Sequence, residues 1–295
     1  MYSTTYKPTA NSYFSGMGGL DLGLLNSGIN VQQSLELDKK ATITLEQNFT
    51  HRVLREDISQ KLVLDQPDAD IHAFTYPCTK YSEIADIHGT RTGDELFLHS
   101  LRHIALKRPE AYVVENVPGM RKFPVVMEAM SKLPDYYIQV FCPINALTWL
   151  PQQRERLIII ATKKHFHITA PSGHCKTSIK SLLEDNPKYT IPDYFINRLN
   201  GDYRDKPIVI DPEDKSAIAP TCVAHYAKDV STRILKDPDS PVGYRPFTPR
   251  EYARLQGFPD WFWLPRTADA YRQIGNAVPV HMGEWIGREL IRYFN

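Results

Sequence analysis

The stretch Phe14-Ser15-Gly16-Met17-Gly18-Gly19 decides the fold of this chain. A short apolar segment precedes it, and Gly18–Ser27, with leucines at helical spacing, follows it. Glycines at a strand-to-helix turn let the backbone pass close to a ligand at the amino terminus of the helix. The stretch therefore predicts the opening strand, turn and helix of a ligand-binding α/β domain, although a tight turn without a ligand has the same local pattern.

Short apolar segments alternate with segments of helical period as far as Lys164, which indicates an α/β domain with a parallel sheet covered on both faces. A third strand is expected just before Asp57. The other predicted strands are Ser12–Phe14, Val31–Leu37, Ile71–Tyr76, Ala111–Val117, Tyr136–Pro143 and Leu157–Thr162. The predicted helices are Gly18–Ser27, Asp94–Lys107, Thr248–Gly257 and His281–Phe294.

The composition changes near His165, where Pro, Lys, Asp and Asn become frequent, and regular patterning returns after Tyr244. Thr248 and Glu251 have the spacing of a capping box at the start of the returning helix. We therefore expect a catalytic domain built from residues 1–165 and 245–295, and a small irregular lobe at residues 166–244.

Composition limits the function classes without selecting one. No apolar run approaches the roughly 20 residues of a membrane span, and the polar amino terminus lacks the features of a secretory signal. The chain has four widely separated cysteines, which favour reduced thiols over a disulfide framework or a metal site. We expect a cytoplasmic protein without metal. Its net charge of +1 does not indicate a nucleic-acid partner, but a local basic cleft can still bind a phosphate backbone.

Reactive side chains follow the predicted strands at the carboxyl edge of the sheet, where open α/β sheets bind ligands. Glu36 ends the second strand, and a carboxylate there suits the paired hydroxyls of a ribose. Cys78 follows the fourth strand, and Glu115 ends the fifth, so a thiol and a carboxyl converge if these strands are neighbours. A lone cysteine is also a common small core residue, and an acidic residue at a strand end is often a cap.

Several stretches, in this order, resemble the motifs of the cytosine-5 DNA methyltransferases. They are Phe14–Gly19, Pro77-Cys78, Glu115-Asn116-Val117, Gln152-Gln153-Arg154-Glu155-Arg156, Arg245–Asp260 and Gln273-Ile274-Gly275-Asn276-Ala277-Val278. The resemblance spans nearly the whole chain apart from the variable lobe. It implies a Rossmann-like methyltransferase sheet that binds S-adenosylmethionine, with residues 166–244 as the target-recognition lobe.

The resemblance also implies a reaction. Cys78 would add as thiolate to carbon 6 of a cytosine, so that carbon 5 accepts the methyl group. Glu115 would contact the N3 edge and the exocyclic amine, while Arg156 and Arg154 would bind the carbonyl oxygen and nearby backbone. Because the base must leave the stack to reach the thiol, the enzyme would flip it out of duplex DNA, with the loop Thr79–Gly93 closing over it.

Matching positions give the remaining site residues. The ring of Phe14 would lie on the adenine, Glu36 would hold the ribose and Asp57 would bind the adenine amine. The full cofactor set is Phe14, Ser15, Gly16, Gly18, Gly19, Glu36, Leu37, Asp57, Ile58, Pro77, Leu96, Asn276 and Ala277. The positions expected to contact DNA are Ser82, Arg91, Gln152 and Thr221.

The chain departs from the family pattern beside the cysteine, where Tyr76 and Thr79 replace the usual neighbours, and in the loop around Arg91. Its lobe is short, which favours a short or relaxed recognition site because few side chains can reach base edges. We interpret the aromatic residues of the segment 252–263, including Trp261 and Trp263, as core.

Three other readings share part of the pattern: a cytosine-5 methyltransferase of transfer RNA, a catalytically silent methyltransferase-like interaction protein, and a nicotinamide oxidoreductase. The last explains the glycine turn but not the convergence of Cys78, Glu115 and Arg156. The expected protein is a monomeric bacterial or phage modification enzyme of duplex DNA, with no membrane partner and with a cognate restriction endonuclease as a candidate partner.

Overall fold

The computed structural model describes residues 6–77, 96–201 and 206–295, so Cys78, Ser82 and Arg91 lie outside the described residues. The chain divides into two compact units. Unit 1 comprises Met1–Asn145, Glu155–Ser172 and Val280–Asn295, and unit 2 comprises Ala146–Arg154 and Gly173–Pro279. Residues 245–279 thus lie in the same compact unit as most of the predicted lobe, residues 166–244. The division into a catalytic domain and a target-recognition lobe stays a prediction.

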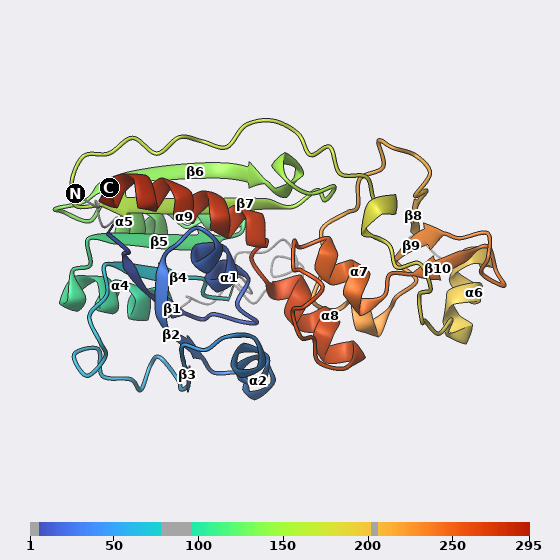
Figure 1. Ribbon diagram of the computed structural model, residues 1–295, viewed down its shortest axis with the longest axis horizontal. Coiled ribbons are helices and arrows are strands. Elements are labelled where there is room, and N and C mark those ends of the chain that lie inside the picture. The colour runs from blue at the N-terminus through green and yellow to red at the C-terminus, as the bar shows by residue number, and fades with distance from the viewer. Residues whose placement is uncertain (1–5, 78–95, 202–205) are drawn as a thin grey trace, which may run out of the picture. The chain divides into compact units, whose positions relative to one another are not determined.

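Unit 1 contains a seven-stranded sheet in the order β3-β2-β1-β4-β5-β7-β6 (Figure 1). The strands are β1 (Thr9–Tyr13), β2 (Asn30–Glu36), β3 (Arg52–Arg55), β4 (Ile71–Phe74), β5 (Ala111–Asn116), β6 (Tyr137–Asn145) and β7 (Glu155–Thr162). The first five run parallel, which places the ends of β1, β2, β4 and β5 along one edge. This arrangement confirms the predicted α/β class.

Strand β7 differs from the predicted parallel pattern, because it pairs antiparallel with both β5 and β6. The connection from β6 to β7 contains no helix that covers the sheet, and antiparallel neighbours need none. As a result, β7 begins where β5 ends, and the start of β7 joins the same edge as the carboxyl ends of the parallel strands.

Helices α1 (Gly19–Asn26) and α9 (Val280–Phe294) pack closely against each other in unit 1 (Figure 1). A side chain at Gly23 would place its Cβ 2.5 Å from the carbonyl oxygen of Val280, so the close approach requires glycine there. Gly28 ends the α1 segment with φ +100°, as predicted for a left-handed cap. Helix α2 (Lys39–Asn48) begins at Asp38, whose side chain accepts from the backbone N–H of Ala41.

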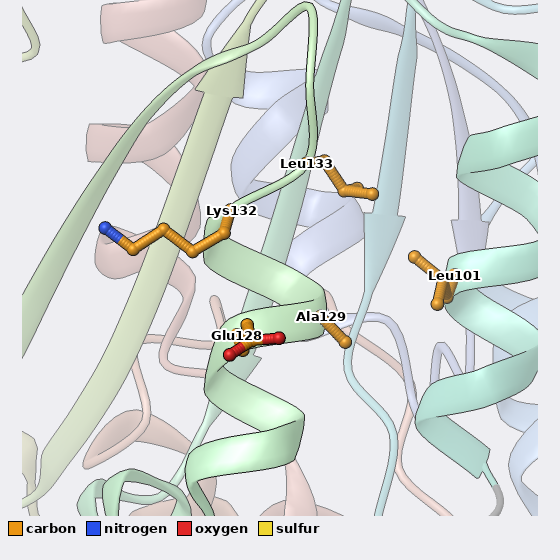
Figure 2. Close-up of a pocket in the computed structure, with 5 residues that line it drawn as sticks. All are labelled: Leu101, Glu128, Ala129, Lys132 and Leu133. Carbon is orange, nitrogen blue, oxygen red and sulfur yellow. The ribbon is translucent and has the colours of Figure 1, made fainter.

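Helices α4 (Leu96–Lys107) and α5 (Pro124–Ser131) contribute to an apolar core with alternate residues of β1, β2, β4, β5 and β7. A 3-10 helix, Pro118–Lys122, connects β5 to α5. Along α4 and α5 lies a pocket of about 410 Å³ (Figure 2). Figure 2 shows Leu101 opposite Ala129 and Leu133, with Lys132 pointing away, and no predicted site residue lines this pocket.

Unit 2 is more regular than the predicted irregular lobe. Its described part contains a three-stranded sheet in the order β10-β9-β8, with one α-helix before these strands in the sequence and two after them. Its elements are α6 (Asp193–Asn200), β8 (Ile208–Ile210), β9 (Arg233–Lys236), β10 (Tyr244–Pro246), α7 (Pro249–Arg254) and α8 (Thr267–Asn276), with short 3-10 helices at Ala146–Thr148, Lys180–Leu182 and Tyr226–Lys228. The predicted capping box is confirmed, since Thr248 and Glu251 each bond the backbone of the other.

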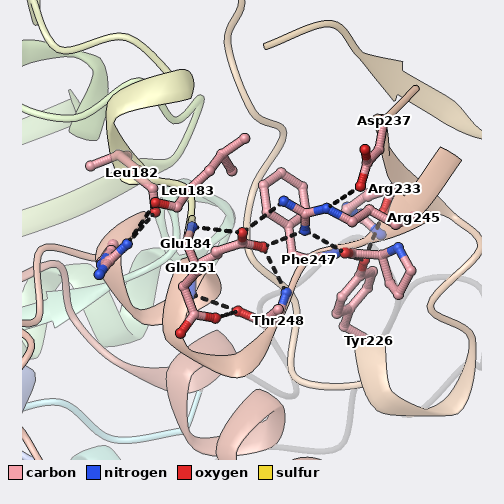
Figure 3. Close-up of polar contacts among 12 residues, drawn as sticks. Leu182, Leu183, Glu184, Tyr226, Arg233, Asp237, Arg245, Phe247, Thr248 and Glu251 are labelled. Atoms are coloured by element: carbon pink, nitrogen blue, oxygen red, sulfur yellow. Dashed lines mark hydrogen bonds and ion pairs between the residues drawn. The ribbon is translucent and has the colours of Figure 1, made fainter. Parts of the chain in front are cut away.

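A buried ion pair connects the strand β10 with the start of α7 (Figure 3). Arg245 donates to both carboxylate oxygens of Glu251 at 2.7 and 2.8 Å. The same carboxylate accepts from the backbone N–H groups of Thr248 and Glu184, so the buried charge is fully hydrogen-bonded. Within the described residues, no helix is long and apolar enough to cross a membrane.

Candidate active site

The glycine turn begins with a residue in an uncommon backbone conformation. Phe14 has φ +60°, a left-handed value that costs an ordinary L-residue about 1 kcal/mol or more. The backbone N–H groups of Phe14 and Ser15 both donate to the carbonyl oxygen of Leu35, at 2.8 and 3.3 Å. At Gly18, φ is +90° and a Cβ would lie 2.4 Å from the ring of Phe49, so only glycine fits this position.

Glu36 connects the tip of β2 to the turn. One of its carboxylate oxygens accepts from the backbone N–H of Gly16 at 2.8 Å, and the other accepts from the N–H of Asp38 at 2.8 Å. The carboxylate is therefore held at the carboxyl edge beside the turn. A Cβ at Gly16 would meet nothing within 4 Å, so the backbone there borders open space. A half-buried ring at Phe14, an open glycine backbone and a fixed carboxylate together suit an adenosine-containing ligand.

A buried acid beneath the turn was missed by sequence reasoning. Asp21 lies in the first turn of α1, fully buried, and its carboxylate accepts from the hydroxyl of Ser34 at 2.8 Å. Burial raises the pKa of Asp21 to about 6. His51 contacts the same hydroxyl at 2.7 Å, and burial lowers the pKa of its ring to about 4. The available signal was a single acidic residue interrupting the apolar start of the helix.

Glu115 and Arg156 meet at the carboxyl edge of unit 1. The guanidinium Nε of Arg156 lies 2.9 Å from Oε1 of Glu115, and the two side chains are only 12% and 10% exposed. Another guanidinium nitrogen donates to the carbonyl oxygen of Glu155 at 2.7 Å. Strand β5 supplies the carboxylate and the first residues of β7 supply the guanidinium, so the antiparallel pairing of these strands brings the two predicted residues together. A planar anion and cation with so little exposure can present both an acceptor and donors to a flat polar ring.

The strand end that leads to Cys78 is anchored on both sides. The side chain of Thr75 donates to the carbonyl oxygen of Phe14 at 2.8 Å, and Asn116 donates from its amide to the carbonyl oxygen of Tyr76 at 3.1 Å. Tyr76 is itself buried, with its hydroxyl donating to the sulfur of Met120 at 3.4 Å. Sequence reasoning noted Tyr76 only as a departure from the family pattern and gave no role to Thr75.

The other predicted cofactor residues of unit 1 have different environments. Asp57 accepts from the backbone N–H of Ser59 at 2.8 Å, and this bond lowers the pKa of its carboxyl. Ile58 is buried in the core, and Leu96 packs against that core at the start of α4. Leu37 is 61% exposed. Pro77 is also exposed, and the described chain stops just after it.

The remaining predicted residues that the structure describes lie in unit 2, on or next to residues 219–224, the Thr221 segment. Arg154 is 1% exposed and donates to three carbonyl oxygens, those of Cys222, Gly275 and Ala277, at 2.8 to 3.0 Å. Gln152 is 0% exposed; its amide donates to the carbonyl of Leu255, and its oxygen accepts from the N–H of Cys222. These two side chains therefore hold backbone together inside unit 2.

Thr221 itself is half-buried, and its hydroxyl donates to the carbonyl oxygen of Gln153 at 2.6 Å. Asn276 is exposed at the end of α8, next to the buried Ala277. Gly275 packs directly on the Thr221 segment, because its Cβ would lie 2.3 Å from the backbone nitrogen of Ala224.

The described cysteines differ in accessibility. Cys222 is buried, and burial raises the pKa of its thiol to about 12. Burial also raises the pKa of the Cys142 thiol. Both groups are protonated at neutral pH and are poor nucleophiles. No group of His, Cys, Asp and Glu side chains suited to a metal ion occurs among the residues that the structure describes.

Comparisons with known proteins give a consistent result. A family model described as C-5 cytosine-specific DNA methylase matches residues 9–292. The chain is 32% identical to the Type II methyltransferase M.NlaX of Neisseria lactamica over 296 residues, covering 90% of this chain and 91% of that protein. It is 30% identical to the Type II methyltransferase M.Bsp6I of Bacillus sp. (strain RFL6), covering 91% and 94%. Among solved structures, the Entamoeba histolytica methyltransferase EhMeth shares the fold, with a TM-score of 0.79, 19% identity and 98% coverage of both chains.

Proposed function

Because this chain belongs to the C-5 cytosine-specific DNA methylases, we propose that the edge formed by the glycine turn, Glu36, Glu115 and Arg156 is its active site. Membership makes it a DNA cytosine-5 methyltransferase, which uses S-adenosylmethionine and acts on DNA. The observation that carries the assignment of the site is the buried Glu115–Arg156 pair at 2.9 Å, formed at the same sheet edge as the Glu36–Gly16 contact.

Residues of the turn would hold the cofactor. When bound, S-adenosylmethionine supplies an electrophilic methyl group. The ring of Phe14 would cover the adenine, Glu36 would bind the ribose hydroxyls, and the open backbone at Gly16 would border the methionine moiety. Asp57, with Leu37, Ile58, Pro77 and Leu96, would complete the adenine side, and Asn276 and Ala277 stay predicted cofactor residues on the family resemblance alone.

The target cytosine would be activated by covalent addition. The thiolate of Cys78 adds to carbon 6, which makes carbon 5 nucleophilic; after methylation a base removes the carbon 5 proton and the thiolate leaves. Glu115 accepts from the exocyclic amine and stabilises the N3 edge as charge moves into the ring, while Arg156 donates to the carbonyl oxygen. This geometry requires a base that has left the duplex stack.

Unit 2 would carry target recognition. Arg154 and Gln152 hold the backbone of the Thr221 segment, so we assign them a supporting role there, with Thr221 as the residue that contacts DNA. By similarity to Type II relatives, a cognate restriction endonuclease is the proposed partner, and the enzyme is proposed to work as a monomer in bacterial or phage DNA modification. Bisulfite sequencing of a methylated plasmid tests the expected short or relaxed site; a long, strictly defined motif would contradict it.

Transfer of a tritiated methyl group tests the site assignment. Wild-type protein should label duplex DNA and not total RNA, and Glu115→Gln should lower kcat about 100- to 1,000-fold. Glu110→Gln is the matched control, because Glu110 pairs with Lys163 at 3.3 Å at the opposite end of the same strands, and it should retain activity. A Glu115→Gln enzyme with nearly normal kcat would contradict the assignment.

A further inference from the structure

Thr75 makes a contact that the family pattern does not explain. It follows β4 directly, and its backbone N–H donates to the carbonyl oxygen of Tyr13 at 3.2 Å, continuing the pairing of β4 with β1. Its side-chain hydroxyl then donates to the next carbonyl, that of Phe14, at 2.8 Å. Two consecutive carbonyls of the chain entering the glycine turn are therefore bound by one residue.

The second of these bonds falls on the strained residue of the turn. Phe14 has φ +60°, and its own N–H donates to Leu35 on the other side, at 2.8 Å. Its peptide groups are thus fixed from β2 by one bond and from Thr75 by the other. A left-handed conformation at a bulky residue persists only where surrounding contacts hold it. The backbone conformation of Phe14 sets the direction of its Cα–Cβ bond, and its ring lies 6.1 Å from that of Tyr76, at 72° to it.

We infer that the Thr75 hydroxyl is a positioning group for the cofactor: it fixes the left-handed backbone of Phe14 and thereby aims the aromatic ring at the adenine. The inference rests on the proposed cofactor site. It also connects the cofactor turn to the chain that reaches Cys78 three residues later, because Thr75 belongs to that chain and its hydroxyl donates to the turn.

Binding of S-adenosylhomocysteine, measured by calorimetry, tests this role. Thr75→Val keeps the shape and removes the hydroxyl, and we expect it to weaken binding about 3- to 10-fold, the usual effect of losing one partly buried hydrogen bond. Thr75→Ser restores the donor and should bind within about twofold of wild type. In turnover, Thr75→Val should raise the cofactor KM and leave kcat at saturating cofactor nearly unchanged.

Thr162→Val is the matched control. Thr162 also donates its hydroxyl to a carbonyl, that of Lys164 at 2.9 Å, but at the far end of the same sheet. The Thr162→Val protein should lose about as much thermal stability as the Thr75→Val protein, but it should keep its affinity for S-adenosylhomocysteine.

A double-mutant cycle with Phe14→Ala locates the effect. If Thr75 acts through the aromatic ring, Thr75→Val should cost little further affinity once that ring is removed. Equal losses in both backgrounds, normal binding by Thr75→Val, or failure of Thr75→Ser to restore binding would each overturn the inference. Absence of binding by the wild-type protein would instead refute the proposed cofactor site.

Discussion

The substitution Glu251→Gln removes one charge from the buried ion pair of unit 2 and changes little in shape. Glu251 is 0% exposed, and its two oxygens accept from Arg245 twice, from the N–H of Thr248 and from the N–H of Glu184. In the variant, one oxygen becomes an NH₂ group that faces two donors. Among the described residues, the guanidinium of Arg245, whose side chain is only 4% exposed, then keeps Asp237 as its one anionic partner, at 2.9 Å.

The expected loss of stability is about 3 kcal/mol, the lower end of the range for breaking a buried ion pair, because Asp237 still neutralises part of the charge. At about 2–4 °C per kcal/mol for a protein of this length, the Tm should fall by about 6–12 °C. Differential scanning calorimetry measures this directly, and urea denaturation gives the corresponding free energy of unfolding.

Glu213→Gln provides the comparison. Glu213 pairs with Lys180 at 2.8 Å, but the two side chains are 73% and 62% exposed, so its loss should cost less than about 1 kcal/mol. If Glu251→Gln melts at the same temperature as Glu213→Gln, the buried pair does not stabilise unit 2 as argued.

Three further outcomes are expected. Burial lowers the pKa of His72 to about 3 and that of His103 to about 4, so these two groups bind more protons in the unfolded chain below pH 6.5; the stability that each histidine contributes is constant above that pH and should fall by about 3 kcal/mol by pH 4, and urea melts of His72→Gln and His103→Gln beside the wild type should show a smaller loss between pH 6.5 and 4. Glu36→Gln should weaken S-adenosylhomocysteine binding about tenfold, measured by calorimetry, and unchanged affinity would remove Glu36 from the cofactor site. Gly275→Ala should destabilise the protein by about 1–3 kcal/mol in thermal melts, since its Cβ would lie 2.3 Å from the backbone of Ala224; a normal Tm would show that this contact relaxes freely.

The sequence was informative where one local pattern has one physical solution. The glycine turn, the strand before it, the helix after it and the helix α9 were predicted, because apolar strand segments, helical period and positive-φ glycines are local patterns. The meeting of Glu115 and Arg156 at one edge was also predicted, on the family resemblance. The distance between these two side chains could not be predicted, because it depends on the antiparallel pairing of β7 with β5.

Other features depend on tertiary contacts that leave little trace in the sequence. Arg154 and Arg156 are two residues apart, yet one is enclosed by backbone carbonyls of unit 2 and the other pairs with Glu115 in unit 1. The core interpretation of the segment 252–263 was right for Tyr252, Phe258 and Phe262, and wrong for Trp261 and Trp263, which are 63% and 41% exposed.

The small sheet of unit 2 was missed for a different reason. Strands β8, β9 and β10 have only three or four residues each, too few for alternation to stand out. Thr75 was missed because a single hydroxyl carries no pattern, and its importance comes only from the carbonyl that it meets.

Covalent trapping tests the central claim most directly. Duplex DNA that contains 5-fluorocytosine is incubated with the protein and labelled S-adenosylmethionine; the fluorine cannot leave as a cation, so the thiol adduct accumulates. We expect a covalent complex with the wild type and with Cys175→Ser, a control thiol in unit 2, and none with Cys78→Ser. A complex that persists in Cys78→Ser would contradict the proposed mechanism.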